Sequence, residues 1–283
     1  VLSNYRVEWA SWAEPGTVAF CRYDLDRGWG VFPDQTGQTN RFGDSCPTGD
    51  YLVNNLGKCV VNDKINGSPS CDLSASNPVN VGNGNKYQKE RDYIGNGVFP
   101  LRWERSYNSH TGRWVYLPRL EINDALLEAK AWRRDGKAYY FGYFSSNWVS
   151  DNSVREKLSE LNDAQGNRTG WQYGTTDNRI EYYDTSGYLQ SVSDGRGNTH
   201  TYVYDTQGRL ERIEHTQGDT LSLAYDTSGR LSTLTDQSGR IWTYRYDALG
   251  NLTFVDSPDG TSKQYHYNET VFTSGADLPY TMA

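Results

Sequence analysis

The sequence lacks the features of several protein classes. It has only 9 Pro and 1 Met in 283 residues, and its formal net charge is -7. No apolar run approaches the ~20 residues that a membrane-spanning helix needs, so no membrane span is predicted. The shortage of Lys and Arg relative to Asp and Glu argues against a nucleic-acid partner, because phosphate binding needs clustered basic side chains.

Cysteine is also scarce, and its four copies lie in the first quarter of the chain: Cys21, Cys46, Cys59 and Cys71. Such clustering indicates either local disulfides or a metal site. Gaps of 25, 13 and 12 residues differ from the close C-x2-C pairs of zinc sites, so disulfides in an oxidising compartment are favoured. The preferred pairing is Cys46 with Cys59 and Cys21 with Cys71, although three connectivities fit the sequence.

Aromatic residues and glycine are what the chain has in excess. It contains 22 Tyr, 9 Trp and 28 Gly, and aromatic residues make up 14% of the chain. This share is far too high for a disordered polar chain, and tyrosine suits a pleated surface that is half in water. The composition therefore predicts an all-β protein with many turns.

A 21-residue repeat organises the last third of the chain. Its ladder tyrosines are Tyr183, Tyr204, Tyr225, Tyr246 and Tyr267; the next residue in four copies is Asp184, Asp205, Asp226 or Asp247; and glycine follows at Gly187, Gly208, Gly229 and Gly250. Aspartate with glycine three positions later is typical of a tight turn, where the carboxylate accepts backbone N–H bonds and glycine supplies a positive φ. Each repeat is therefore predicted to be a β-hairpin, with the aromatic side chains of successive second strands on one face.

Two local patterns in the repeats need a choice. Leu210 and Ile213 are three apart in a first strand, which indicates either a β-bulge or a strand covered on both faces. Ser153 and Glu156 resemble the capping box of a helix, but the residues that follow keep the spacing of the repeat. Because register over several positions outweighs a four-residue signal, a hairpin is predicted over residues 157–173.

The YD-x-x-G-x-L core at this 21-residue step resembles the RHS/YD-repeat family, which includes bacterial polymorphic toxins and the teneurins. The segment NPVNVGNGNKYQKERDYIGNGVFPLRWERSYNS resembles the lead-in domain that precedes RHS repeats in bacterial proteins. Its matching positions are Asn77, Pro78, Gly84, Asn85, Lys86, Tyr87, Asp92, Tyr93, Pro100, Leu101, Arg105, Tyr107 and Asn108. The resemblance covers residues 76–283.

This resemblance implies a structural role. RHS repeats form a sheet that spirals into a shell around a C-terminal toxin, which is released by self-cleavage. About five hairpins are too few to close a shell, so we expect a partial shell and the N-terminal part of a longer protein, with an open sheet edge near Tyr267 that favours self-association. No self-cleavage motif follows Tyr280, so neither protease nor toxin activity carries over.

The expected organisation is a disulfide-bearing β module at 1–75, the lead-in domain at 76–150 and stacked repeat hairpins at 151–283. The expected partners are further RHS repeats and an enclosed C-terminal toxin of the full-length protein. The expected function is a non-enzymatic scaffold for bacterial competition. Such a protein would be exported from a bacterium, to be secreted or held at the cell surface.

No catalytic, cofactor-binding or metal-ligating residue is predicted. The histidines lack metal or triad spacing, which favours surface or lining roles: His110, His200, His215 and His266. The alternative function is an extracellular carbohydrate-binding or adhesion module, in which Tyr and Trp faces such as Trp242 and Tyr244 bind cell-surface glycans. A weaker third alternative is a hydrolase within residues 1–150, because carboxylate pairs such as Glu121 and Glu128 occur there.

Overall fold

The computed structural model describes most of the chain after residue 84 and only parts of what precedes it. Described are residues 63–67, 85–150, 153–269 and 282, and, as strands alone, 2–9, 18–26, 31–40, 51–53, 59–61, 74–75 and 79–80. Two compact units are present: residues 1–62 with 149–152, and residues 63–148 with 153–283. The segment boundaries expected at residues 75 and 150 stay predictions.

The first unit is built from antiparallel strands. A three-stranded sheet contains β1 (Leu2–Trp9), β2 (Val18–Asp26) and β3 (Val31–Asn40), and a short hairpin pairs β4 (Tyr51–Val53) with β5 (Cys59–Val61). Cys46 and Cys71 lie outside the described residues, and so do the side chains of Cys21 and Cys59. The disulfide pairing therefore stays a prediction.

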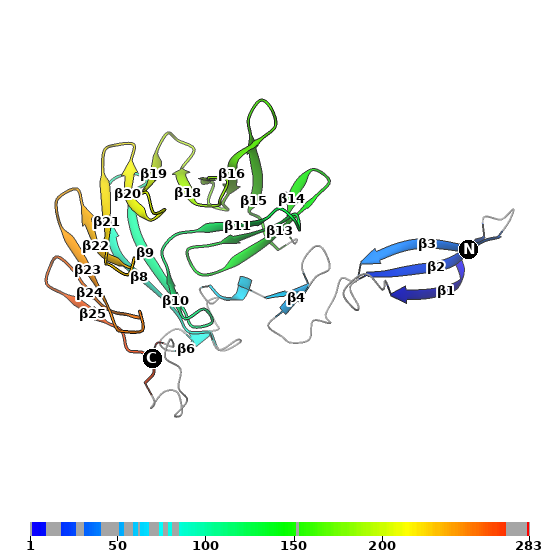
Figure 1. Ribbon diagram of the computed structural model, residues 1–283, viewed down its shortest axis with the longest axis horizontal. Helices are drawn as coiled ribbons and strands as arrows, with labels where there is room; N and C mark the ends of the chain where they lie inside the picture. The colour runs from blue at the N-terminus through cyan, green and yellow to red at the C-terminus, as the bar shows by residue number, and fades with distance from the viewer. Residues whose placement is uncertain are drawn as a thin grey trace. The chain divides into compact units, whose positions relative to one another are not determined.

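The second unit contains one long sheet and two small ones. The single-turn 3-10 helix η1 (Asp63–Ile65) precedes the hairpin β6 (Ser74–Ala75) and β7 (Val79–Asn80) and the lead-in sheet of β8 (Tyr87–Ile94), β9 (Arg102–Asn108) and β10 (Arg113–Val115). The long sheet has 15 antiparallel strands in sequence order, and it curves from β11 to β25 (Figure 1). The all-β repeat fold predicted from the sequence is confirmed.

The strands of the long sheet follow the repeat. They are β11 (Arg119–Asn123), β12 (Glu128–Trp132), β13 (Ala138–Phe144), β14 (Asn147–Val149), β15 (Lys157–Asn162), β16 (Arg168–Gly174), β17 (Ile180–Tyr183), β18 (Leu189–Ser193), β19 (Thr199–Tyr204), β20 (Leu210–His215), β21 (Thr220–Tyr225), β22 (Leu231–Asp236), β23 (Ile241–Tyr246), β24 (Leu252–Asp256) and β25 (Ser262–Gln264). The hairpin predicted over 157–173 is β15 with β16. Strands β11 to β14 belong to the region expected to be the lead-in domain, so that region and the repeats share one sheet.

A β-bulge in each repeat explains the spacing of apolar residues in the first strands. Tyr204 pairs with Leu210, but Val203 pairs with Arg212, so one extra residue lies between them. The same register shift occurs where β17 pairs with β18, β21 with β22 and β23 with β24. Because the bulge changes the parity of the strand, Leu210 and Ile213 are both buried on the same face. The structure thus decides for the bulge.

The ladder tyrosines connect each repeat to the one before it. In three copies the hydroxyl donates a hydrogen bond to the carbonyl oxygen of the leucine that starts the preceding first strand: Tyr204 to Leu189 at 2.7 Å, Tyr225 to Leu210 at 2.7 Å and Tyr246 to Leu231 at 2.9 Å. Burial raises the pKa of Tyr225 to about 12, so this hydroxyl stays a donor at neutral pH. A buried polar group needs such a partner, which explains why tyrosine rather than phenylalanine recurs.

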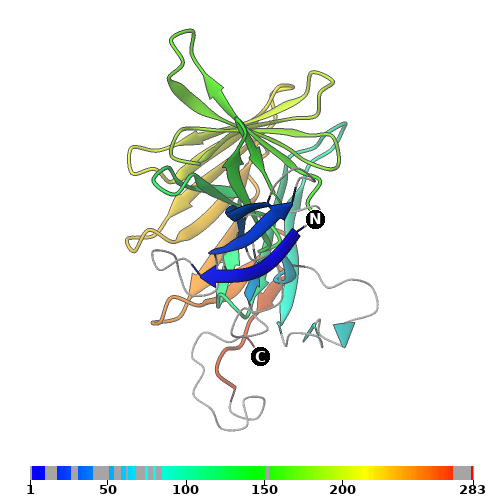
Figure 2. The same cartoon turned by 90° about the vertical axis from the view of Figure 1, so that its right-hand side faces the viewer.

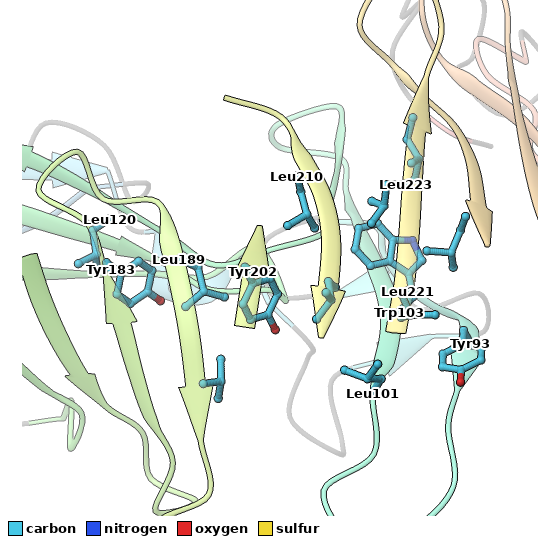
Figure 3. Packing of buried hydrophobic residues seen from close by; sticks show 14 of the residues in the cluster. Tyr93, Leu101, Trp103, Leu120, Tyr183, Leu189, Tyr202, Leu210, Leu221 and Leu223 are labelled. Atoms are coloured by element: carbon cyan, nitrogen blue, oxygen red, sulfur yellow. The ribbon is translucent and has the colours of Figure 1, made fainter. Parts of the chain in front are cut away.

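The lead-in sheet packs against the inner face of the long sheet. Leu101, which directly precedes β9, and Trp103 in β9 lie in one buried cluster with Tyr202, Leu210 and Leu221 of the repeats (Figure 3). Figure 2 shows the same curved sheet turned by 90°. The hydrophobic core of the second unit is therefore shared between the lead-in strands and the repeats.

The long sheet ends close to Tyr267, where the sequence placed its edge. Its last strand is β25, Ser262–Gln264, which is exposed and pairs with β24 on one side only among the described strands. Tyr267 does not mark the edge: it forms an isolated β-bridge with Met282, and its hydroxyl accepts a hydrogen bond from Trp114 Nε1 at 3.0 Å. Among the described strands, the edge of the sheet is thus β25, whose last residue, Gln264, is three positions before Tyr267.

The long sheet also contacts itself near its start. The backbone N–H of Leu120 in β11 donates to the carbonyl oxygen of Gly187 at 3.0 Å, and Arg119 forms a β-bridge with Tyr188. Gly187 has a φ of 85°, and a Cβ atom there would overlap the carbonyl oxygen of Leu120. Gly208 has a φ of 75°, and a Cβ atom added there would have no neighbouring atom within 4 Å. Only the first repeat glycine thus has both a turn and a packing role.

We expect Gly187→Ala to destabilise the protein more than Gly208→Ala. Both substitutions force alanine into a positive φ, at a cost of about 1 kcal/mol, but only Gly187→Ala adds a clash with backbone, which brings its total to about 2–4 kcal/mol. Urea denaturation followed by tryptophan fluorescence measures both values. Equal losses of stability would show that the contact with Leu120 does not constrain the sheet.

Candidate functional site

The candidate site is the inner face of the long sheet, where the lead-in strands separate two cavities. The polar cavity, of about 690 Å³, is lined by both acidic and basic side chains, among them Arg133, Glu181 and His200. The aromatic cavity, of about 890 Å³, is lined by Trp103, Trp114, leucines and four of the five ladder tyrosines. Both cavities lie wholly within the second unit.

A buried ion pair joins the lead-in sheet to the last repeats. Arg105 Nε donates to Asp92 Oδ2 at 2.7 Å, and both side chains are almost completely buried. Arg105 Nη2 also donates to the Tyr265 hydroxyl at 2.6 Å, and the Tyr244 hydroxyl donates to Asp92 Oδ2 at 2.9 Å. The guanidinium lies 4.3 Å from the centroid of the Trp114 ring. Burial alone would lower the pKa of Arg105, but Asp92 more than offsets this, so the side chain stays charged.

We expect loss of one partner of this pair to cost more than loss of one tyrosine hydroxyl. Asp92→Asn would leave the Arg105 charge buried without a counter-ion, at about 3–5 kcal/mol, whereas Tyr244→Phe would cost about 1–2 kcal/mol. Tyr182→Phe is the matched control and should change stability little, because Tyr182 lies on the face of β17 opposite to the buried Tyr183. Chemical denaturation checks the order; an Asp92→Asn variant as stable as Tyr182→Phe would contradict it.

A second charged cluster joins the β12–β13 turn to β17. Arg133 donates to both carboxylate oxygens of Glu181, at 2.6 and 2.8 Å, and the Tyr183 hydroxyl donates to Glu181 Oε2 at 2.5 Å. Arg133 also lies over the ring of Tyr173, 4.3 Å from its centroid. Tyr183 is therefore the ladder tyrosine that uses a carboxylate instead of a leucine carbonyl. A buried cluster whose charged groups all have hydrogen-bond partners is typical of a structural contact.

The repeat aspartates and glycines form the turns after the ladder strands. Each aspartate accepts backbone N–H bonds from the residues two and four positions later: Asp184 from Ser186 and Tyr188, Asp205 from Gln207 and Arg209, Asp226 from Ser228 and Arg230, and Asp247 from Leu249 and Asn251. The hydrogen bond from the Arg230 backbone lowers the pKa of Asp226. The glycines Gly187, Gly208, Gly229 and Gly250 have φ values of 75–87°. These positions shape turns and do not converge on one site.

Buried asparagines hold the lead-in sheet to the segment at residues 63–67. The backbone carbonyl oxygen of Asn66 accepts hydrogen bonds from the side-chain amides of Asn85 and Asn108. The side-chain oxygen of Asn85 accepts from the Ser109 backbone N–H at 3.1 Å. These contacts give a structural reason for two of the positions that carried the family resemblance. Three others, Asn77, Pro78 and Gly84, lie outside the described residues.

Two histidines form a buried pair that sequence reasoning missed. His200 in β19 and His215 in β20 are cross-strand neighbours with ring centroids 5.3 Å apart. His200 Nε2 donates to the carbonyl oxygen of Phe99 at 2.8 Å, and the Phe99 ring stacks on it at 4.1 Å. A surface role is therefore wrong for His200, although it does line the polar cavity. The register of the hairpin, which sets these two positions opposite each other, could have revealed the pair.

The other two histidines differ in their surroundings. His110 Nδ1 lies 2.9 Å from Asn66 Oδ1, and His266 is exposed, 3.3 Å from Glu269. In the described part of the chain, no three His, Cys, Asp or Glu side chains gather as metal ligands do. Among the described residues there is also no helix with the length and apolar character for crossing a membrane.

We expect His200 to make stability depend on pH. Burial lowers the pKa of His200 to about 4, below the 6.5 of an unfolded chain. The unfolded state therefore takes up the proton first, so stability should fall by about 3 kcal/mol as the pH drops from 6.5 to 4. Thermal melts across this range check the slope. His200→Gln should remove most of it and His266→Gln should not; an unchanged slope in His200→Gln would refute the assignment.

Comparison with protein families matches two parts of the chain. The model described as RHS Repeat matches residues 225–262, which include the turn and strands that follow Tyr225. The model described as Domain of unknown function (DUF6531) matches residues 76–141, which include the Arg105 ion pair and the buried asparagines. The chain therefore contains an RHS repeat. The resemblance noted in the sequence is thereby confirmed.

Solved structures similar to this RHS-repeat protein come from Tc toxins. One is the Photorhabdus luminescens Tc holotoxin pore with a TccC3 mutation, at 14% identity over 64% of this chain and 11% of that chain, with a TM-score of 0.28. Another is the crystal structure of TcdB2-TccC3-TEV, at 12% identity over 94% of this chain and 16% of that chain, with a TM-score of 0.28. The RHS-repeat protein thus spans less than a fifth of either chain. No curated protein matches it.

Proposed function

We propose that this RHS-repeat protein is a non-enzymatic β-shell scaffold, which in its full length encloses and delivers a C-terminal toxin in bacterial competition. The observation that carries the proposal is the continuous sheet of 15 strands in sequence order, curved around an interior lined by buried side chains. The same bulge recurs in four hairpins, and three ladder tyrosines make the same hydroxyl contact with the preceding repeat. Further repeats can therefore extend the wall without new kinds of contact.

The lead-in sheet supports the role of a starting point for the shell. It contacts early and late repeats at once: Phe99, between β8 and β9, stacks on His200, whereas Arg105 of β9 reaches Tyr265. A sheet with separate early and late contacts inside the curve fixes how tightly the first repeats wind. We propose that residues 76–150 set the curvature of the wall and that residues 151–283 continue it.

The buried charges support a structural role over a catalytic one. The Asp92 carboxylate is bound by Arg105 and Tyr244, and the Glu181 carboxylate is bound by Arg133 and Tyr183. A general acid or base needs to exchange its proton with a substrate, whereas these carboxylates are held by charged or phenolic donors of the same fold. The ion pairs therefore serve to connect the lead-in sheet with the repeats.

The proposed partners are further RHS repeats and the enclosed toxin, and the proposed location is outside the bacterial cytoplasm. The composition of residues 1–75, with four cysteines, supports export. The alternative of a glycan-binding module is less well supported. Trp242 and Tyr244 are only 6% and 3% exposed, and Trp242 packs against the Tyr93 ring at 5.6 Å, so neither presents a free face to a sugar.

We expect the C-terminal region of the full-length protein to resist protease at least tenfold longer than the same region expressed alone. Leu234→Asp, at a fully buried position of the wall, should abolish this protection, because a buried charge opens the sheet. Ile241→Asp, at a half-exposed position, is the control and should preserve it. Limited proteolysis with mass spectrometry gives the rates. Cleavage of the unmutated full-length protein as fast as of the isolated region would refute the enclosure.

A further inference from the structure

The lining of the aromatic cavity combines apolar side chains with basic ones. Its lining combines ladder tyrosines and leucines with the guanidinium groups of Arg113, Arg119 and Arg230, and it contains no Asp or Glu. Arg230 is neutralised by Asp226, which lies 2.7 Å away. Among the described residues, no carboxylate lies within 4 Å of Arg113 or Arg119. Both arginines are exposed, and Arg119 lies 4.4 Å from the centroid of the Tyr188 ring. Two cations thus border an apolar space with no counter-ion among the described residues.

A second observation comes from the opposite wall of the same cavity. Trp103 is 3% exposed, and its indole Nε1 is buried without a hydrogen-bond acceptor. Trp103 also stacks on Tyr116, with ring centroids 5.5 Å apart, so its ring is held in place. An indole nitrogen is a donor only, and a buried donor without an acceptor costs free energy. An acceptor oxygen brought into the cavity would satisfy it.

The exposed side of the cavity favours an extended ligand. Tyr204, Tyr225, Tyr246 and Tyr267 come from successive repeats, so the cavity runs across the strands. Hairpins in a sheet are about 9–10 Å apart, since neighbouring strands are separated by about 4.8 Å. Three such steps cover about 29 Å, which matches roughly eight to nine residues of extended chain. Leu249 is exposed at the rim, where it adds apolar surface.

We propose that the aromatic cavity binds an extended polypeptide segment that combines apolar side chains with Asp or Glu. The apolar side chains contact the leucines and tyrosine rings, the carboxylates pair with Arg113 and Arg119, and a backbone carbonyl oxygen of the segment accepts from Trp103 Nε1. This inference rests on the proposed function, because a shell that encloses a polypeptide needs wall sites that hold it. The inference adds which kind of peptide segment the aromatic cavity binds.

Fluorescence anisotropy of labelled peptides with this chain tests the proposal. The probe is a peptide of about nine residues that alternates leucine or phenylalanine with glutamate. One matched peptide carries lysine in place of glutamate, and another carries serine in place of the apolar residues. We expect the acidic apolar peptide to bind at least tenfold more tightly than either, with an affinity that falls as salt rises.

Variants of the cavity locate the binding. Arg113→Gln together with Arg119→Gln should weaken binding at least tenfold and reduce its salt dependence, and Trp103→Phe should weaken it about fivefold. Arg245→Gln, an exposed arginine outside the cavity that pairs with Asp256, is the control and should bind normally. Thermal melts show whether each variant remains folded, and only folded variants are compared.

The outcomes separate this inference from the function on which it rests. Three outcomes would overturn the proposed peptide site. The glutamate and lysine peptides bind equally, the arginine variants bind as tightly as the unchanged chain, or a fatty acid such as laurate binds and the peptide does not. Protease protection in the full-length protein is measured without any peptide. If protection is found and peptide binding is not, the shell stands and only the proposed cavity ligand is wrong.

Discussion

The β-bulge that recurs in every repeat is the constraint on which the rest of the interior depends. A regular strand would place Leu210 on one face and Ile213 on the other, because side chains alternate. The extra residue reverses this alternation and puts both on the inner face. It also increases the twist of the strand, which favours a curved sheet over a flat one. The ladder tyrosine then donates to the carbonyl of the residue at the bulge in the preceding repeat, so one hairpin defines the position of the next.

The lead-in sheet packs inside this curve and holds the repeats in one arrangement. Its polar side chains are not solvated but buried against the repeats, where the Arg105–Asp92 pair meets Tyr244 and Tyr265. A buried ion pair adds little net stability compared with an apolar contact, but it tolerates few alternative partners. Such contacts select one arrangement of the lead-in sheet on the repeats. The close approach of Gly187 to Leu120 limits the same section from the other side.

The two cavities differ in the charged side chains that line them. In the polar cavity, Glu181 and Arg133 neutralise each other, and further acidic side chains line the same space. In the aromatic cavity, the carboxylates that could neutralise Arg113 and Arg119 are absent from the described surroundings. The lining of one cavity thus contains carboxylates and that of the other contains none, which supports the proposed acidic ligand of the aromatic cavity.

Sequence by itself determined the repeat architecture of this protein. The step of 21 residues, the Asp–Gly turns and the period of two in the second strands predicted hairpins, because turns and alternation depend on local backbone conformation. The lead-in motif was recognised, but its residues had no assigned contacts. Residues such as Asp92 and Tyr244 are 152 positions apart, and nothing in a local pattern indicates that they meet.

Tertiary structure decided everything that depends on how the sheet curves. Leu210 could face inward by a bulge or be covered on both sides, and only strand pairing distinguishes these. The sequence placed His200 at the surface or in a lining, because it does not show the contact with Phe99, which lies between β8 and β9 and 101 positions away. The site at Trp103, Arg113 and Arg119 is likewise formed by packing, since segments far apart in the sequence line the same cavity. Local chemistry thus defines the unit that repeats, and long-range packing defines the space that the units surround.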